Sequence, residues 1–342
     1  MKAYYKEILF PFANPLGTSR GTLHAKEVFF VFVEKDGFTG IGETGLFASL
    51  SFDDVPHYRE KLSWACQNIA LPWEELSQEL KEFPSIVFGL EQALLSLKNR
   101  SMELFPSDFT LGKQGIAING LIWMGDSAFV QSQIQKKLEV GYSCIKMKIG
   151  VDWPSELAIL EGLRKRFPKE TLEIRVDANG AFSFLDAKEV LKKLQDLQIH
   201  SIEQPIKKGQ IQEMASLANL GACPVVLDEE LIGVLDFENQ KTLLKTISPK
   251  YVIFKPSLIG GFEKTDRWIS LCSELGIGWW ITSALETNIG LSAISQYTFT
   301  KNSPMFQGLG TGGLFTQNVP SPLELKGQEL FYNPEKPWKL PS

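Results

Sequence analysis

Cys144-Ile-Lys-Met-Lys-Ile-Gly150, Arg175-Val-Asp-Ala-Asn179 and Ser201-Ile-Glu-Gln-Pro205 are three short stretches at similar intervals along the chain. In the first two, charged or polar residues alternate with apolar ones. A period of two indicates β-strands, because successive side chains of a strand point to opposite faces. A stretch with helical periodicity, 183–195, lies between the second and the third. Strands that alternate with helices predict a parallel sheet with crossover helices.

The same alternation continues through most of the chain after residue 110. Helical patterns such as 183–195 and 261–275 lie between short apolar runs. Eight strands are expected, at Ile116–Ile122, Ser143–Ile149, Leu172–Ala178, Ser201–Gln204, Val225–Asp228, Tyr251–Lys255, Trp279–Ser283 and Met305–Gln307. Eight parallel strand-helix units close into a barrel, so the predicted class is α/β.

Residues 1–110 have a different pattern. Two strands are expected at 27–34 and 39–44, joined by a turn at Lys35-Asp36-Gly37, and helices at 54–70 and 85–104. Strands followed by helices predict an α+β unit that caps the barrel. The expected domains are therefore a cap at 1–110, a catalytic barrel at 111–310 and a tail at 311–342 that returns towards the cap.

Composition excludes several classes of protein. The 342 residues are 44% hydrophobic and carry a net charge of −5, without a block of like charge. This is unlike a disordered chain or a basic nucleic-acid binder. No apolar run is long enough to span a membrane, the N-terminus is unlike a secretory signal, and the four cysteines are far apart. We expect a reduced, cytoplasmic protein that binds a small molecule, with no nucleic-acid or membrane partner. Its oligomeric state is left open.

Polar side chains recur where the expected strands end, and barrel active sites lie at that end. Successive members are 25 to 29 residues apart, which is one strand-helix unit. They are Lys148, Asp177, Glu203, Asp228, Lys255 and Ser283. Alternation puts Lys146 and Lys148 on one strand face, and likewise Arg175, Asp177 and Asn179. The outer face must be apolar to pack on helices, so these side chains are expected to point inward.

Three of these residues are carboxylates on neighbouring strands. Asp177, Glu203 and Asp228 would repel one another unless a cation lay between them. A hard cation that prefers oxygen ligands, most simply Mg²⁺, fits this set. The alternative is that each carboxylate pairs with a lysine or caps a helix. Three in register, with lysines on both sides, favour the metal.

Lysines flank the carboxylates on both sides. Lys148 and Lys255 would face each other across a bound substrate, and Lys146 lies beside Lys148. A lysine becomes a usable base where a nearby cation lowers its pKa from about 10.4. Opposed lysines around a carboxylate triad indicate removal of a proton next to a metal-bound carboxylate.

These stretches give the chain a resemblance to the enolase superfamily, in the branch with a Lys-x-Lys motif, and within it to the o-succinylbenzoate synthase family. The resemblance covers nearly the whole chain. Besides the three stretches quoted first, it is carried by Val226-Leu-Asp-Glu229, Phe254-Lys-Pro-Ser257, Ile281-Thr-Ser-Ala-Leu-Glu286, Gly308-Leu-Gly-Thr-Gly-Gly-Leu-Phe-Thr-Gln-Asn318 and Ser85-Ile-Val-Phe-Gly-Leu-Glu91. It implies an enolase-like modified TIM barrel, (β/α)7β, with an N-terminal α+β capping domain.

The resemblance also implies an activity. This is the Mg²⁺-dependent syn dehydration of 2-succinyl-6-hydroxy-2,4-cyclohexadiene-1-carboxylate to o-succinylbenzoate in menaquinone biosynthesis. Lys148 would remove the proton next to the substrate carboxylate and protonate the hydroxide that leaves from the same face. Mg²⁺ would stabilise the enediolate, which is a known pattern of this superfamily. Lys146 would lower the pKa of Lys148, and Lys255 would stabilise the anion from the opposite face.

Supporting roles follow from the same resemblance. Asn179 and Arg175 occupy positions that commonly support the metal shell, and Ser283 lies where this branch contacts the substrate carboxylate. Glu229 points away from Asp228 by alternation and is expected to act behind it.

The cap is expected to contribute a loop. In Thr18-Ser19-Arg20-Gly21, a polar stretch separates two apolar segments, and in this superfamily such a loop closes over the barrel mouth. Ser19 and Arg20 would then contact the succinyl arm. An ordinary surface connection is the alternative.

Other functions remain open. An N-succinylamino acid racemase or dipeptide epimerase of the same superfamily would use the same opposed lysines. The epimerase usually carries Asp-x-Asp near the last strand, where this chain has Gly308-Leu-Gly310. A barrel glycosidase could use Glu203 with an aspartate, but it would not need the lysines and would survive chelation. A scaffold that only binds Mg²⁺ would turn over nothing.

Overall fold

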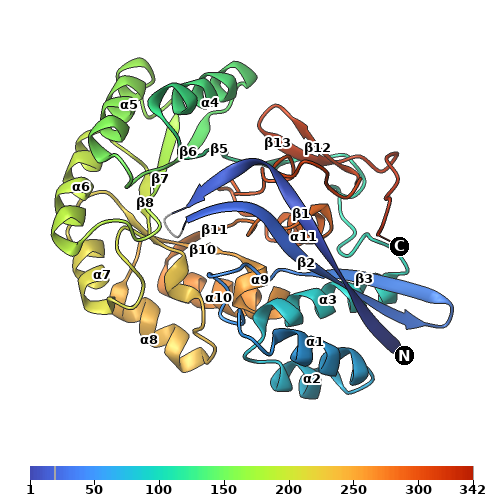
Figure 1. The fold of residues 1–342 in the computed structure, drawn as a ribbon. Helices are drawn as coiled ribbons and strands as arrows, with labels where there is room; N and C mark the ends of the chain where they lie inside the picture. The colour runs from blue at the N-terminus through green and yellow to red at the C-terminus, as the bar shows by residue number, and fades with distance from the viewer. Residues whose placement is uncertain (19–20, 342) are drawn as a thin grey trace.

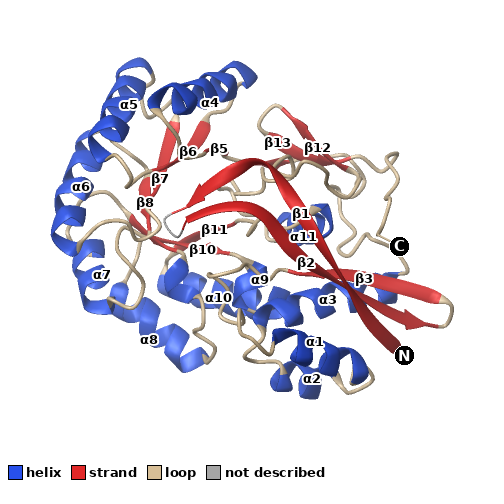
Figure 2. Ribbon diagram, in the orientation of Figure 1, coloured by secondary structure: helices blue, strands red, loops and turns tan. Residues whose placement is uncertain are grey.

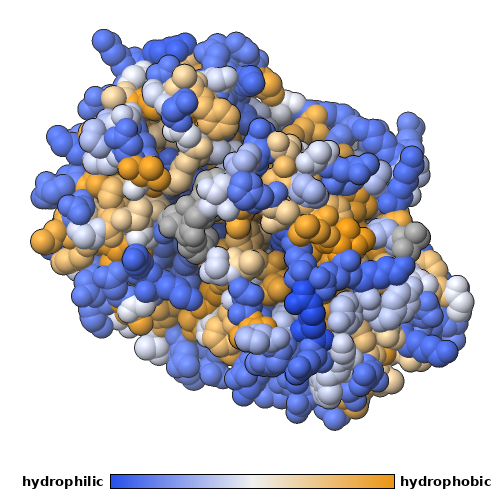
Figure 3. Space-filling model, in the orientation of Figure 1, coloured by the Kyte–Doolittle hydropathy of each residue, from blue (hydrophilic) through white to orange (hydrophobic). Residues whose placement is uncertain are grey.

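The computed structural model describes residues 1–18 and 21–341 and places a barrel of strands and helices beside a three-stranded antiparallel sheet (Figure 1). Ser19 and Arg20, expected at the substrate, lie outside the described residues. Figure 2 shows the two longest strands of the antiparallel sheet crossing in front of the barrel in this view. Figure 3 shows a mostly hydrophilic face with smaller hydrophobic areas among the polar ones. Among the described residues, no helix is long and apolar enough to cross a membrane.

The barrel sheet has seven parallel strands whose spatial order follows the chain. They are β5 (Gly120–Ile122), β6 (Cys144–Lys148), β7 (Glu173–Asp177), β8 (Ser201–Glu203), β9 (Val225–Leu227), β10 (Tyr251–Phe254) and β11 (Gly278–Ile281). The outward residues Ile145, Met147 and Ile149 are at most 1% exposed. The expected alternation is confirmed, because the outer face packs on helices.

Helices cover the outside of this sheet (Figure 1). They are α4 (Ser127–Val140), α5 (Trp153–Arg166), α6 (Phe184–Asp196), α7 (Ile211–Ala218), α8 (Phe237–Ile247), α9 (Pro256–Ile259), α10 (Gly261–Leu275) and α11 (Asn288–Thr300). The helices expected at 183–195 and 261–275 are confirmed as α6 and α10. A short 3-10 turn, Glu229–Leu231, follows β9.

The expected eighth strand, Met305–Gln307, is wrong as a strand. Gln307 and Gly308 make only isolated parallel bridges, to Ile118 and Thr282. These bridges still join the two edges of the sheet, because Ile118 precedes β5 and Thr282 follows β11. The segment is too short for a ladder, since Pro304 has no N–H to donate and glycines follow.

The expected first strand, 116–122, is divided. Ile116–Ala117 forms β4, which pairs with a C-terminal hairpin of β12 (Leu323–Lys326) and β13 (Glu329–Tyr332), and only the second half joins the barrel. Between the barrel and this hairpin, the chain passes the cap. There the backbone N–H of Ala13 donates to Leu314 and that of Thr316 donates to Pro11.

The antiparallel sheet contains β1 (Lys2–Thr18), β2 (Gly21–Lys35) and β3 (Phe38–Thr44). It packs on α3 (Pro84–Asn99) and on α1 (Tyr58–Gln67), and α2 (Trp73–Glu79) lies between these two helices in the chain. The approach of β3 to α3 is very close, since a Cβ on Gly42 would lie 2.0 Å from the Gly89 carbonyl oxygen. Sequence reasoning missed β1 and α2, whereas the strands at 27–34 and 39–44 are confirmed as parts of β2 and β3.

The start of α3 is held by a buried carboxyl from the preceding loop. Asp53 is 1% exposed, and its Oδ2 accepts hydrogen bonds from the Ser85 backbone N–H at 2.9 Å and from the Ser85 hydroxyl at 2.6 Å. Burial raises the pKa of Asp53 from 3.8 to about 6, although these bonds oppose the rise.

Because of the raised pKa of Asp53, we expect part of the free energy of unfolding to depend on pH. The folded state holds the Asp53 proton to higher pH than the unfolded state, so its contribution becomes less favourable as pH rises through this window. We expect the stability of the wild type minus that of Asp53→Asn to fall by on the order of 2 kcal/mol between about pH 4 and pH 7. Urea unfolding at several pH values measures this difference. A difference that stays constant would contradict the prediction.

Candidate active site

Six side chains expected to form a ring follow one another around the barrel. They are Lys148, Asp177, Glu203, Asp228, Lys255 and Ser283. Lys148, Asp177 and Glu203 are the last residues of β6, β7 and β8 and pair in register. The other three come directly after β9, β10 and β11, or one residue later. Because the strands are parallel, the structure brings all six to one end of the barrel.

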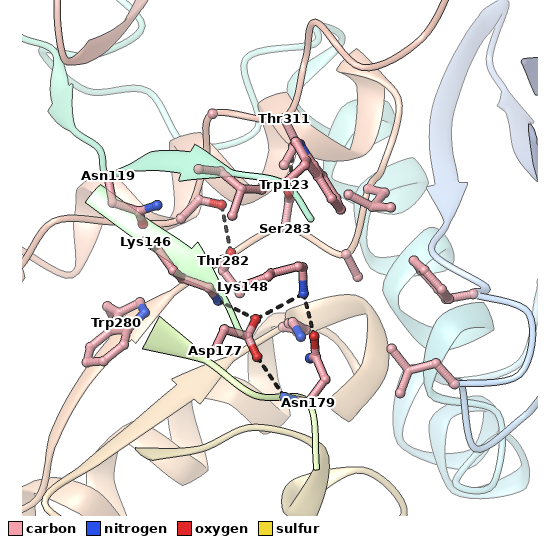
Figure 4. Close-up of a pocket in the computed structure, with 18 residues that line it drawn as sticks. Asn119, Trp123, Lys146, Lys148, Asp177, Asn179, Trp280, Thr282, Ser283 and Thr311 are labelled. Atoms are coloured by element: carbon pink, nitrogen blue, oxygen red, sulfur yellow. Dashed lines mark hydrogen bonds and ion pairs between the residues drawn. The ribbon is translucent and has the colours of Figure 1, made fainter. Parts of the chain in front are cut away.

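Lysines and carboxylates contact one another directly in this ring. Lys146 Nζ lies 3.1 Å from Asp177 Oδ2 and also contacts Glu203. Lys148 Nζ lies 3.1 Å from the same Asp177 oxygen. Figure 4 shows both lysines directed at Asp177. On the other side, Lys255 pairs with Asp228. The site therefore combines negative and positive groups inside the barrel.

The acidic residues differ in their electrostatic surroundings. Burial raises the pKa of Glu203 well above its usual value, and repulsion from Asp177 and Asp228 adds to the rise. Burial also acts to raise the pKa of Asp177, but the cations of Lys146 and Lys148 outweigh it, so this pKa falls. The need for additional positive charge is therefore greatest at Glu203.

The pKa values of the Lys146 and Lys255 amines are set by burial and by the neighbouring carboxylates. Burial lowers the pKa of Lys146, but attraction from Asp177 and Glu203 outweighs burial and raises it overall. The same balance, with Asp228 as the main attracting group, raises the pKa of Lys255. In this arrangement both amines are held as cations by the carboxylates. The role expected of Lys146 towards Lys148 stays a prediction.

The donor set suits a hard divalent cation. Asp177, Glu203 and Asp228 are at most 3% exposed, and they offer the oxygen ligands that Mg²⁺ prefers. Glu203 Oε1 is buried and has no hydrogen-bond partner among the described residues. As the side chains stand, no three acidic, histidine or cysteine residues in the described part converge closely enough to hold a metal. The carboxylates contact lysines instead, while the spare oxygen of Glu203 leaves a ligand position available.

Asn179 orients the lysine at the end of β6. Its Oδ1 accepts a hydrogen bond from Lys148 Nζ, and its Nδ2 donates to Glu229 Oε1 at 3.0 Å. Its backbone N–H donates to Asp177 Oδ1 at 3.1 Å, and its φ of 44° is left-handed. Asparagine tolerates this conformation better than most residues. The structure thus places Asn179 between Lys148 and Glu229. The support of the metal shell expected of Asn179, and the role expected of Glu229 behind Asp228, stay predictions.

Arg175 lies deeper in the barrel than the strand-end ring. Its register partner on β6 is Lys146 rather than Lys148. Its Nε donates to Glu173 at 2.7 Å, and its guanidinium stacks 4.1 Å from the ring centre of Trp280. The expectation that Arg175 supports the metal shell is not matched by a contact with the ligand carboxylates in the described structure. The reason is its position two residues before Asp177, one layer lower on the same face.

A cavity opens beside this ring. Charged and polar residues that line it include Lys146, Lys148, Asp177, Asn179 and Lys255. Ser283 lies on the wall, where its hydroxyl is 2.5 Å from that of Thr311. The contact expected between Ser283 and substrate remains a prediction.

Apolar residues also line the cavity, and sequence reasoning missed them. They include Phe47 and Leu50 from the cap and Ala284 and Leu285 from the loop after β11. Trp123 completes the wall near Lys148, whose Nζ lies 5.9 Å from the ring centre. Strand alternation after β5 could have indicated Trp123, but no local pattern indicates the cap residues.

Comparison with known proteins agrees with this arrangement. The family model described as Enolase C-terminal domain-like matches residues 130–329. An o-succinylbenzoate synthase of Desulfotalea psychrophila is 44% identical over 96% of this chain and 98% of that protein. An N-succinylamino acid racemase of Thermus thermophilus is 27% identical over 80% of this chain and 75% of that protein.

Solved structures give the same result for the fold. The crystal structure of MenC from Desulfotalea psychrophila superposes with a TM-score of 0.86 at 40% identity, covering 97% of this chain and 99% of that one. A dipeptide epimerase from Enterococcus faecalis, complexed with Mg and the dipeptide L-Leu-L-Tyr, has a TM-score of 0.85 at 17% identity, covering 98% and 97%. The second likeness concerns the fold alone.

Proposed function

Because the chain belongs to the enolase C-terminal domain-like family, we propose that it dehydrates 2-succinyl-6-hydroxy-2,4-cyclohexadiene-1-carboxylate to o-succinylbenzoate, a step of menaquinone biosynthesis. The observation that carries the proposal is a pair of lysines with three carboxylates between them in chain order. Lys148 is the last residue of barrel strand β6, and Lys255 comes directly after β10. The enzyme is accordingly a lyase. A cytoplasmic location stays a prediction from the sequence.

Lys148 carries both proton transfers. Its amine takes the proton from the ring carbon that bears the carboxylate, and the electrons of that C–H bond pass towards the carboxylate. They return as a new C=C bond while the C–O bond to the hydroxyl breaks, and Lys148 gives its proton to the departing hydroxide on the same face. The products are o-succinylbenzoate and water, and Lys148 regains its starting state. Asp177 and Asn179 hold its amine in place.

The remaining charged groups stabilise the negative charge that develops on the carboxylate. Mg²⁺, which we propose is held by Asp177, Glu203 and Asp228, supplies positive charge at the substrate carboxylate when bound. Lys255 contributes a fixed cation from the opposite side of the barrel. Lys146 keeps Asp177 and Glu203 in position through its two contacts.

A second candidate function would use the same two lysines. Lys148 and Lys255 approach the substrate from two sides, which suits removal of a proton on one face and its return on the other. The chain therefore has the groups for racemisation of an N-succinylamino acid, the activity named for the Thermus thermophilus relative.

One assay separates these functions. Purified protein is mixed with the cyclohexadiene substrate and Mg²⁺, and the aromatic product is followed by absorbance. N-succinylamino acids are tested in parallel by polarimetry. Turnover of the first substrate that stops on chelation supports the proposal. Racemisation alone replaces it with the second candidate, and activity that survives exhaustive chelation excludes both.

Replacing Asn179 provides a test of how Lys148 is oriented. Asn179→Ala removes the acceptor for the Lys148 amine and the link to Glu229. We expect turnover to fall about 10- to 100-fold, as for other residues that orient a metal site. Steady-state kcat with saturating Mg²⁺ measures this loss. Asn179→Asp, which keeps the acceptor oxygen, serves as the comparison, and equal losses in both variants would contradict the orienting role.

A further inference from the structure

Lys26 of the cap donates hydrogen bonds to two consecutive carbonyl oxygens of the cavity wall. Its Nζ lies 3.0 Å from the oxygen of Ala284 and 2.9 Å from that of Leu285, more than 250 residues away in the chain. We propose that Lys26 is a positioning residue that fixes this wall and thereby determines how tightly the substrate is held. The inference rests on the proposed function for the identity of the substrate.

The segment that Lys26 holds has an unusual backbone. Leu285 lies on the apolar wall of the cavity and has a φ of 61°. A bulky apolar residue such as leucine rarely adopts this left-handed conformation, and it keeps the conformation only where the surroundings impose it. The carbonyl of Leu285 is one of the two that accept from Lys26. An ammonium donates stronger hydrogen bonds than a neutral group, so Lys26 is well suited to impose the conformation.

Lys26 also lies near the cap side of the same wall. Its Nζ is 5.8 Å from the ring centre of Phe47, which lines the cavity together with Leu50, Ala284 and Leu285. Only 6% of Lys26 is exposed. One buried cation therefore contacts both the cap part and the barrel part of the wall.

The neighbouring contacts fix other parts of the loop. Glu43, also from the cap, accepts from the backbone N–H groups of Thr287 and Gly290 at 2.9 Å, at the start of α11. Glu286 accepts from the backbone N–H of Ala284 at 2.7 Å. These carboxylates hold N–H groups, whereas Lys26 holds the carbonyls of Ala284 and Leu285. Loss of Lys26 would leave both carbonyls without this donor.

The lining of the cavity indicates which kinetic parameter depends on Lys26. A substrate whose carboxylate lies beside the lysines fills the rest of the same cavity, which Phe47 and Leu285 line. This wall is thus expected to contact the succinyl arm, while Lys148 acts on the ring carbon. A loosened wall weakens binding without removing a group from the chemistry. We expect Lys26→Met to raise KM about tenfold and to change kcat by less than about threefold.

The experiment compares Lys26→Met with Lys26→Arg and Lys35→Met. Lys26→Arg keeps the charge and should recover part of the KM. Lys35→Met alters an exposed lysine at the other end of β2 and should match the wild type. Amide hydrogen exchange of the peptide that covers 283–287 is measured on the same proteins. It should be faster in Lys26→Met alone, which a general loss of stability would not reproduce.

If Lys26→Met is unstable, the double variant Lys26→Met/Leu285→Gly still tests the inference. Glycine adopts a positive φ without cost, so Leu285→Gly removes the strain that Lys26 opposes. The KM increase of the double variant should therefore be smaller than the product of the two single increases. Wild-type protein that does not turn over the cyclohexadiene substrate would defeat the proposed function, and loop exchange would still decide the role of Lys26. Unchanged KM and unchanged exchange in Lys26→Met, or fully multiplicative effects, would overturn the inference.

Discussion

Lys148→Ala is expected to lower the rate of dehydration by about 10³- to 10⁴-fold, the largest effect of any single change in this chain. The same amine must remove the proton and then protonate the leaving hydroxide. Loss of Lys148 therefore removes the proton donor and acceptor of both steps. The contacts to Asp177 and Asn179 show that this amine already has a fixed direction before substrate binds. Lys169→Ala, at an exposed position, is the control and should retain full activity.

Exchange of the substrate α-proton with solvent separates Lys148 from Lys255. Lys148→Ala should lose exchange completely, because the base is gone. Lys255→Ala should form product slowly and keep part of the exchange, because it loses only a cation beside the developing anion. Proton NMR in D₂O measures the exchange of the α-proton and the formation of product in both variants. Exchange that persists in Lys148→Ala and disappears in Lys255→Ala would place the base on the opposite face, and normal exchange in both would reject the mechanism.

The second large effect is expected at the three carboxylates. Asp177→Asn, Glu203→Gln and Asp228→Asn should each weaken Mg²⁺ binding and lower turnover by about 100-fold or more, since each removes a charged ligand and part of the charge stabilisation. The fold should be retained.

Titration calorimetry with Mg²⁺ and circular dichroism distinguish loss of metal from loss of fold. Glu189→Gln, at an exposed position of helix α6, is the matched control and should bind Mg²⁺ as the wild type does. Wild-type affinity for Mg²⁺ in any two of the three variants would reject the ligand assignment. So would full activity after exhaustive chelation.

Much of the barrel could be predicted because the evidence for it is local. A parallel strand buried against helices needs an apolar outer face, and this requirement shows in the alternation around Ile145 and Met147. Strand ends in successive units meet at one edge whatever their side chains, so the spacing of Lys148, Asp177 and Glu203 was enough to predict that they meet. The family resemblance then added proposed roles, and these roles and the domain boundaries at 110 and 310 stay predictions.

The features that were missed or predicted wrongly from the sequence are those whose structure depends on residues distant in the chain. β1 shows no clean alternation, and it exists because it pairs with β2 over Lys2 to Pro11 and, after a shift in register, over Leu16 to Thr18. The segment at Met305–Gln307 was expected to be a strand, but it contributes isolated bridges that close the barrel. Arg175 shares a face with Asp177, as alternation requires, yet its depth in the barrel puts it beside Trp280 rather than at the ligands.

The sequence by itself determined the barrel class, the face of each strand and the set of charged residues at one end, because periodicity and chain order fix these without reference to distant parts. Tertiary structure alone decided which cap residues complete the cavity and which groups hold them. Phe47 and Leu285 line one cavity, and Lys26 meets the carbonyls of Ala284 and Leu285, only when the cap packs against the barrel. Such contacts depend on the position and angle of one unit on the other, and no local spacing encodes either.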